Sequence, residues 1–190
     1  MKTMKSDPVQ DYILEDENKL CTAAAVFNAW LEVRKKLVSD FLDRLERALR
    51  LKKELEDWDF ELWGHPFINS EAGFSFWKRE WKYEYYVSLE LLDHGEDVTF
   101  GLARDFDQEH IKKRPRSNKL LSAVREHYPT ARDHRWGEAY VTMQPPDWRK
   151  PEVLWRMRDE NNEFLDVVVE QLLEVAKTSA PFVDQLAGKK

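Results

Sequence analysis

The segment FSFWKREWK, residues 74–82, contains the pattern Glu80-x-Lys82, whose residue types suit metal-dependent cleavage of a phosphodiester. In such sites an Asp and a Glu bind Mg²⁺ through oxygen atoms, and a Lys two residues after the Glu helps to activate the attacking water. In a strand, residues i and i+2 share one face, and Asp57 or Asp59 would supply the upstream carboxylate. Because the pattern is short and 35% of the chain is charged, we favour a charged and aromatic strand region with an accidental match.

Other residue types that catalyse reactions or bind metals are scattered. None of the five His has metal-binding spacing; they are His65, His94, His110, His127 and His134. Cys21 is the only cysteine, which excludes a disulfide framework and a cysteine-rich zinc site. The glycine and serine fingerprints of nucleotide-binding loops and hydrolases do not occur. We therefore expect no cofactor and no metal.

Positive charge is concentrated in one stretch of the chain. The net charge is -6, yet residues 112–135 carry eight Lys or Arg against two acidic residues. Such a patch can bind nucleic-acid phosphates or an acidic partner surface. Internal pairing with an acidic C-terminal helix is the simpler interpretation. The residues that would face a ligand are Lys112, Lys113, Arg114, Arg116 and Arg132.

Acidic residues recur at helical spacing near the C-terminus, and they are Asp159, Glu163, Asp166, Glu170 and Glu174. A stripe of this kind could imitate DNA phosphates and so inhibit a DNA-binding protein. Its helical period favours an ordinary solvated helix face.

The hydrophobic pattern predicts the elements that position these residues. Apolar side chains at three- and four-residue steps predict a helix over 22–55, roughly 50 Å long at 1.5 Å per residue. Such a helix protrudes, or its apolar stripe is covered by a second helix, from this chain or from a partner. Alternation predicts an antiparallel hairpin of strands 85–92 and 98–103. The remaining expected elements are a helix over 118–127, a strand over 138–143 and a helix over 152–179 that Pro181 ends.

This order predicts an α+β fold, with a long N-terminal amphipathic helix, a small antiparallel β-sheet and C-terminal helices. We expect a polar segment over 1–21 and a single domain over 22–186. The sequence shows no apolar leader and no long apolar run, so we expect a cytoplasmic protein with no membrane contact.

Three stretches together resemble a known group of proteins. They are FNAWLEVRKKLVSDFLDRLERAL, FWKREWKYEYYVSLELLDHGEDVTFGLARD and RWGEAYVTMQPPDW, the last leading into the final helix. Over residues 22–186 the chain resembles the C-terminal accessory region of bacterial PD-(D/E)xK nuclease superfamily proteins. In that group the catalytic Asp and E-x-K residues precede this region. The resemblance therefore implies that the catalytic part is missing and that Glu80 and Lys82 are not catalytic.

We thus expect a non-enzymatic protein-interaction module. The resemblance implies a subunit, sensor or inhibitor in a bacterial or phage nuclease-based defence or anti-defence system. A protein partner or a second copy would engage the long helix and the aromatic sheet face, with Trp30, Trp77, Trp81 and Tyr85 as the structural or interface aromatics. One alternative is a divergent metal-dependent PD-(D/E)xK-like nuclease with Asp59 and Glu80 on the metal and Lys82 at the water. The other is an acidic DNA-mimic inhibitor.

Overall fold

The computed structural model describes residues 7–105, 117–134, 137–159 and 163–187. The chain has the expected α+β fold, and it divides into two units, residues 1–36 and residues 37–190. The long helix α2 runs from Glu17 to Arg50 and contributes to both units. The predicted helix over 22–55 is therefore confirmed, with both ends shifted toward the N-terminus.

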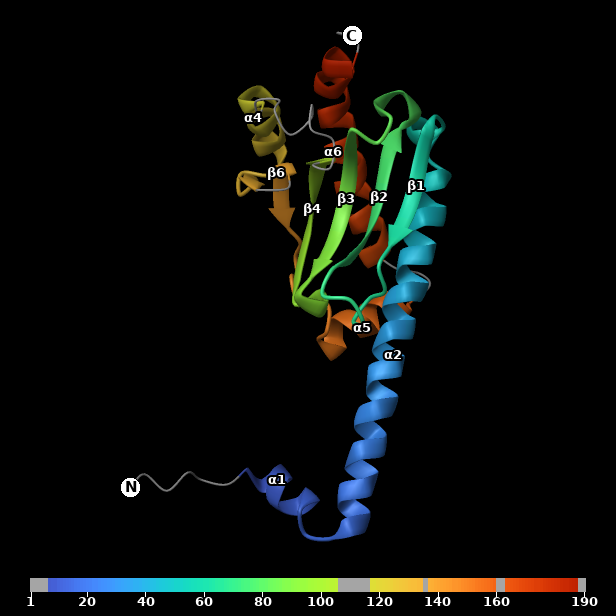
Figure 1. The fold of residues 1–190 in the computed structure, drawn as a ribbon, viewed down its shortest axis with the longest axis vertical. Helices are drawn as coiled ribbons and strands as arrows, with labels where there is room; N and C mark the ends of the chain where they lie inside the picture. The colour runs from blue at the N-terminus through green and yellow to red at the C-terminus, as the bar shows by residue number, and fades with distance from the viewer. Residues whose placement is uncertain (1–6, 106–116, 135–136, 160–162, 188–190) are drawn as a thin grey trace, which may run out of the picture. The chain divides into compact units, whose positions relative to one another are not determined.

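The unit 37–190 is built on a six-stranded antiparallel sheet with the strand order β1-β2-β3-β4-β6-β5 (Figure 1). The strands are β1 (Trp58–Trp63), β2 (Ala72–Lys78), β3 (Tyr85–Leu92), β4 (Asp97–Arg104), β5 (Arg132–His134) and β6 (Gly137–Thr142). The helices are α4 (Asn118–His127), α5 (Pro151–Arg158) and α6 (Glu163–Ala187), and the 3-10 turns are η1 (Lys53–Leu55), η2 (Arg79–Trp81) and η3 (Asp93–Gly95).

Local signals in the sequence explain several of these elements. The β3–β4 hairpin forms where apolar and polar residues alternate, and it confirms the predicted hairpin. Helix α4 begins after Ser117, whose hydroxyl accepts a hydrogen bond from the Leu120 amide at 3.2 Å, a typical N-cap. It covers the predicted range 118–127.

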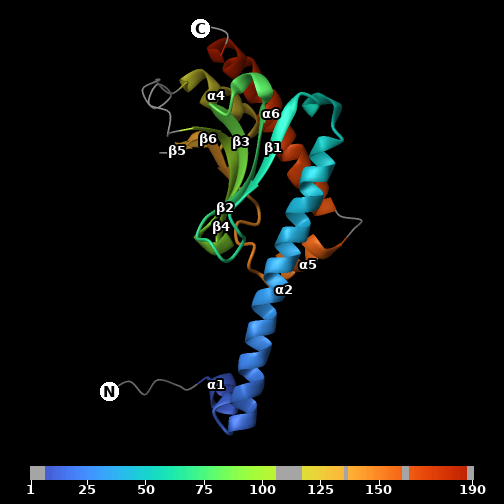
Figure 2. The ribbon, with the colours of Figure 1, turned by 45° about the vertical axis from the view of Figure 1, so that its right-hand side comes forward.

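Helices cover one face of the sheet, and the core lies beneath them. Figures 1 and 2 show α6 running behind the strands. Asp184 of α6 accepts hydrogen bonds from Lys78 at 2.6 Å and from the Trp81 indole at 2.8 Å, which fixes α6 to the end of β2. Phe41 of α2 packs between Trp148 and Phe164, with ring centroids 5.4 Å from each. Rings of this size bury a large apolar area each and so help to hold the unit together.

Three expectations need correction. The helix predicted over 152–179 is two helices, α5 and α6, and Pro181 lies inside α6 rather than ending it. Strand β1 was not predicted, because glycine and proline in the connection after it made the aromatic segment resemble a loop. The strand expected over 74–82 ends at Lys78.

The unit 1–36 contains helix α1 (Pro8–Ile13) and the first part of α2. Asp7 caps α1 by accepting a hydrogen bond from the Val9 amide at 2.8 Å. The Lys19 ammonium lies 4.2 Å from the centre of the Tyr12 ring. None of the described side chains in this unit is buried. Throughout the described residues, no helix is both long and apolar enough to cross a membrane.

Candidate functional site

The face of the sheet opposite α6 carries polar and aromatic side chains, and no helix of the described residues covers it (Figure 1). We call this surface the polar face. Its strand side chains are Asp59, Glu61, Trp63, Ser75, Trp77, Tyr86, Ser88, Glu90, Thr99, Tyr140 and Thr142. The register aligns one row across all the strands, namely Glu61, Ser75, Ser88, Gly101, Tyr140 and Arg132. Small side chains therefore occupy the middle of the row, and large or charged ones occupy its ends.

A hydrogen-bonded group lies at the centre of the polar face. The Tyr140 hydroxyl donates to the Glu90 carboxylate at 2.5 Å, and the Ser88 hydroxyl donates to the same oxygen at 3.0 Å. Tyr140 and Ser88 are 5% and 0% exposed. Burial, and then the charge of Glu90, raises the pKa of Tyr140 well above its ordinary value. The tyrosine thus stays protonated and orients the carboxylate.

Gly101 makes this arrangement possible. It lies between Ser88 and Tyr140 in the row, so no side chain separates them, and their hydroxyl oxygens are 3.3 Å apart. A Cβ atom at Gly101 would lie 2.1 Å from the Ala139 carbonyl oxygen, which is far inside contact distance. The glycine therefore permits the close approach of β4 and β6.

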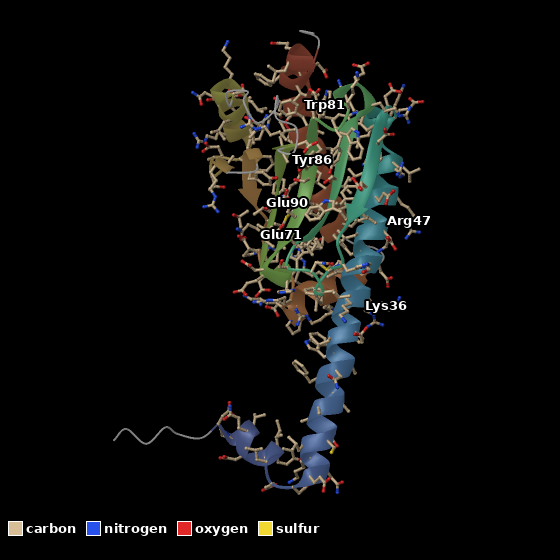
Figure 3. All side chains as sticks on the ribbon, in the orientation of Figure 1. Lys36, Arg47, Glu71, Trp81, Tyr86 and Glu90 are labelled. Carbon is tan, nitrogen blue, oxygen red and sulfur yellow. The ribbon has the colours of Figure 1, made fainter. Side chains whose placement is uncertain are left out.

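Four aromatic rings extend the polar face toward β1 and β2. Trp77 meets Tyr83 edge-on with centroids 4.5 Å apart, and Tyr83 stacks on Tyr86 at 4.8 Å. Trp63 donates its indole hydrogen to Ser75 at 3.0 Å. Its ring lies over Gly73, where a Cβ atom would lie 2.6 Å from the ring. Tyr86 and Glu90 lie four residues apart on β3 and therefore on the same face of the sheet (Figure 3).

The electrostatic character of the polar face is negative. Burial, and then the carboxylates of Glu61, Asp105 and Glu90, together raise the pKa of Tyr83 to about 12. Asp59 at the edge of the face is paired with Arg79 at 3.1 Å. Carboxylates beside half-buried rings attract cations, since a ring face stabilises a cation and a carboxylate pairs with it.

The E-x-K residues do not form the expected strand geometry. Glu80 belongs to the 3-10 turn η2, and Lys82 follows it with a positive φ of 53°, so the two side chains do not share a strand face. The chain turns here because Trp81 must reach the core and bond to Asp184. Both residues are exposed, and Asp59 pairs with Arg79 instead. Among the described residues, no group of three His, Cys, Asp or Glu side chains could hold a metal.

The four predicted interface aromatics occupy different environments. Trp81 and Tyr85 are 1% and 3% exposed, so they have the structural role of core side chains. Trp77 is half-buried on the polar face, where a partner can reach it. Trp30 is half-buried in the unit 1–36.

The predicted basic patch falls largely outside the described residues, since Lys112, Lys113, Arg114 and Arg116 are not among them. Arg132 is exposed on the edge strand β5 and ends the row that contains Tyr140.

The predicted acidic stripe is not continuous. Asp159 follows α5, whereas the exposed Glu163, Asp166 and Glu170 belong to α6. Glu174 of α6 lies 3.1 Å from the His127 imidazole.

Sequence reasoning missed the residues at the centre of the polar face. The alternation Tyr86-x-Ser88-x-Glu90 in the predicted hairpin was the available signal. Trp63 and Tyr140 could not be joined to it without the order of all the strands. No protein-family profile, no curated protein and no solved structure matches this chain, so the polar face is interpreted from its own geometry.

Proposed function

We propose that this protein is a non-enzymatic interaction module that binds a basic segment of a partner protein on the polar face. The single observation that carries the proposal is the juxtaposition of the exposed Glu61 carboxylate and the Trp77–Tyr83–Tyr86 rings; burial raises the pKa of Tyr83, and Glu61 is the charge that raises it most beyond that. An Arg or Lys side chain laid across these rings would gain cation–π contact and a carboxylate partner together.

The geometry favours binding over catalysis. Among the described residues, the Ser88 hydroxyl lies beside a carboxylate that could act as a base, but Ser88 is 0% exposed and donates its hydrogen bond to Glu90. A nucleophile in that position does not reach a substrate. The raised pKa of Tyr140 makes its phenol a hydrogen-bond donor rather than a base near neutral pH.

The charge of the face favours a protein partner over nucleic acid. Glu61, Asp105 and Glu90 lie close enough to Tyr83 to raise its pKa, and carboxylates at this part of the polar face disfavour a phosphate backbone. Proteins that bind nucleic acid are themselves basic, and their basic segments suit this surface. The resemblance to the accessory region of PD-(D/E)xK nuclease superfamily proteins supports a role as a subunit, sensor or inhibitor in a bacterial or phage nuclease-based defence or anti-defence system.

A titration with hexa-arginine tests the proposal. The indole nitrogens are labelled with ¹⁵N, and the Trp signals are assigned by single Trp→Phe substitutions. We expect the signals of Trp63 and Trp77 to shift, because both rings lie on the polar face. Trp148, which is 0% exposed, and Trp155, which is 68% exposed on α5, serve as internal controls. Hexa-glutamate is the control peptide.

The proposal fails if hexa-arginine leaves Trp63 and Trp77 unmoved. It also fails if Trp155 shifts as much as they do, since that result would mean diffuse attraction to an acidic protein of net charge -6.

A further inference from the structure

The first part of α2, from Glu17 to Lys36, has an exposed apolar stripe. Leu20, Ala24, Phe27 and Leu31 recur at four-, three- and four-residue steps, so they share one face of the helix. Phe27 and Leu20 are 59% and 49% exposed. Exposed large side chains in one contiguous stripe mark an interaction surface.

Charge is distributed along this segment with opposite signs at its two ends. Glu15, Asp16, Glu17 and Lys19 precede the uncharged part of the stripe, and Glu32, Arg34, Lys35 and Lys36 follow it, so the first end is net acidic and the second net basic. Lys19 pairs with Glu15, and Lys35 pairs with Glu32 at 2.7 Å, within each end. Between them, residues 20–31 carry no charge at all. A segment with a net acidic end, a net basic end and an uncharged middle is complementary to a second copy that runs in the opposite direction.

We infer that two copies of this chain pair through residues 15–36 with their helices antiparallel. When Glu17 of one copy faces Arg34 of the other, and Lys19 faces Glu32, the numbers of facing residues sum to 51. The same alignment, chosen on charge alone, places Phe27 opposite Ala24 and Leu20 opposite Leu31. Phe27 then meets the small Ala24, which lets the helices approach closely there, and Leu20 packs against Leu31. The contact is isologous and closes as a dimer.

The strength of the contact follows from its size. Twenty residues of helix span about 30 Å at 1.5 Å per residue. Two such helices bury less than the ~1,600 Å² of a standard interface. The dimer is therefore in exchange with the monomer, and dilution dissociates it. Salt weakens it because the charged ends contribute.

The oligomeric state of the full chain is the first test. Analytical ultracentrifugation is expected to show a concentration-dependent rise from 22.7 kDa to twice that mass. Phe27→Ala is expected to weaken the dimer at least tenfold. Val33→Ala is the matched control, because Val33 is 45% exposed on the same helix but off the stripe. Hexa-arginine binding is unchanged in Phe27→Ala, so the failure of this inference and the failure of the proposed function are distinguishable.

Disulfide trapping in a Cys21→Ser background tests the direction of the helices. Leu20→Cys mixed with Leu31→Cys is expected to give the disulfide-linked heterodimer, and Leu20→Cys alone is expected to stay unlinked. In the antiparallel pair the two Leu20 positions are about 16 Å apart along the axis, which is too far for a disulfide. Linkage of Leu20→Cys with itself would show a parallel pair and would overturn the inference. A chain that stays monomeric up to millimolar concentration would overturn it as well.

Discussion

Replacing Tyr140 by Phe removes one hydroxyl from the centre of the polar face and keeps the ring. The lost hydroxyl donates to the Glu90 carboxylate at 2.5 Å and lies 3.3 Å from the Ser88 hydroxyl. Because the acceptor is charged and the ring is 5% exposed, water does not replace the bond well. The substitution should therefore be costly although it removes a single atom.

The magnitude follows from the kind of bond. A hydrogen bond to a charged group contributes about 1.5–3 kcal/mol to the free energy of unfolding. For a domain of about 150–250 residues, each kcal/mol shifts Tm by about 2–4 °C. We expect Tyr140→Phe to lower Tm by about 3–12 °C. Tyr128→Phe is the matched control, because the Tyr128 hydroxyl makes only a 3.4 Å bond to the Gln171 carbonyl, and we expect it to cost less than about 1 kcal/mol.

Thermal unfolding gives the Tm of both variants, and urea unfolding followed by circular dichroism gives their free energies of unfolding. The midpoint of Tyr140→Phe should fall while the slope of the transition is unchanged, which is the signature of a lost native interaction. If Tyr140→Phe costs no more than Tyr128→Phe, the bond to Glu90 does not hold the centre of the polar face, and the reasoning is refuted.

Three other predictions follow from the same structure. The pKa values of Tyr83 and Tyr128 are raised to about 12, so the native state retains these protons between pH 10 and 12. The stabilisation is full below pH 10 and is lost as the pH approaches 12. Tyr83→Phe should flatten this decline of the urea midpoint with pH, and an unchanged decline would contradict the prediction. Gly101→Ala places a Cβ atom 2.1 Å from the Ala139 carbonyl oxygen and should cost roughly 3 kcal/mol or more in thermal unfolding; a loss below about 1 kcal/mol would show that β4 and β6 can separate. Glu80→Ala should change the free energy of unfolding by less than about 0.5 kcal/mol, because Glu80 is exposed, and the purified wild type should show no Mg²⁺-dependent cleavage of DNA; a cleavage activity that Glu80→Ala abolishes would restore the nuclease alternative.

The sequence predicted the elements whose signals are local. The β3–β4 hairpin and helix α4 follow from alternation and from the cap at Ser117, and both lie where they were expected. The turn at Glu80 was not predicted, because the burial of Trp81 against Asp184 involves residues far apart in the chain. Pro181 was taken as a helix end, although packing carries α6 beyond it to Ala187.

The polar face needed information that no local pattern contains. Ser88 and Glu90 were visible as the outer positions of one strand, but Tyr140 reaches them only because β6 pairs with β4. Trp63 belongs to the polar face because β1 pairs with β2, and a connection rich in turn residues joins these two strands. Strand order and register, rather than propensity, decide which side chains meet.

The most direct test of the interaction proposal compares the hexa-arginine affinity of two charge-matched variants. Glu61→Gln removes a carboxylate from the polar face, and Glu170→Gln removes one from the exposed face of α6. We predict that Glu61→Gln weakens binding about 2–5-fold, as expected for ~0.5–1 kcal/mol from one exposed charge, and that Glu170→Gln binds as the wild type does. Equal weakening by both variants, or no effect of Glu61→Gln, would contradict the assignment of the polar face as the binding surface.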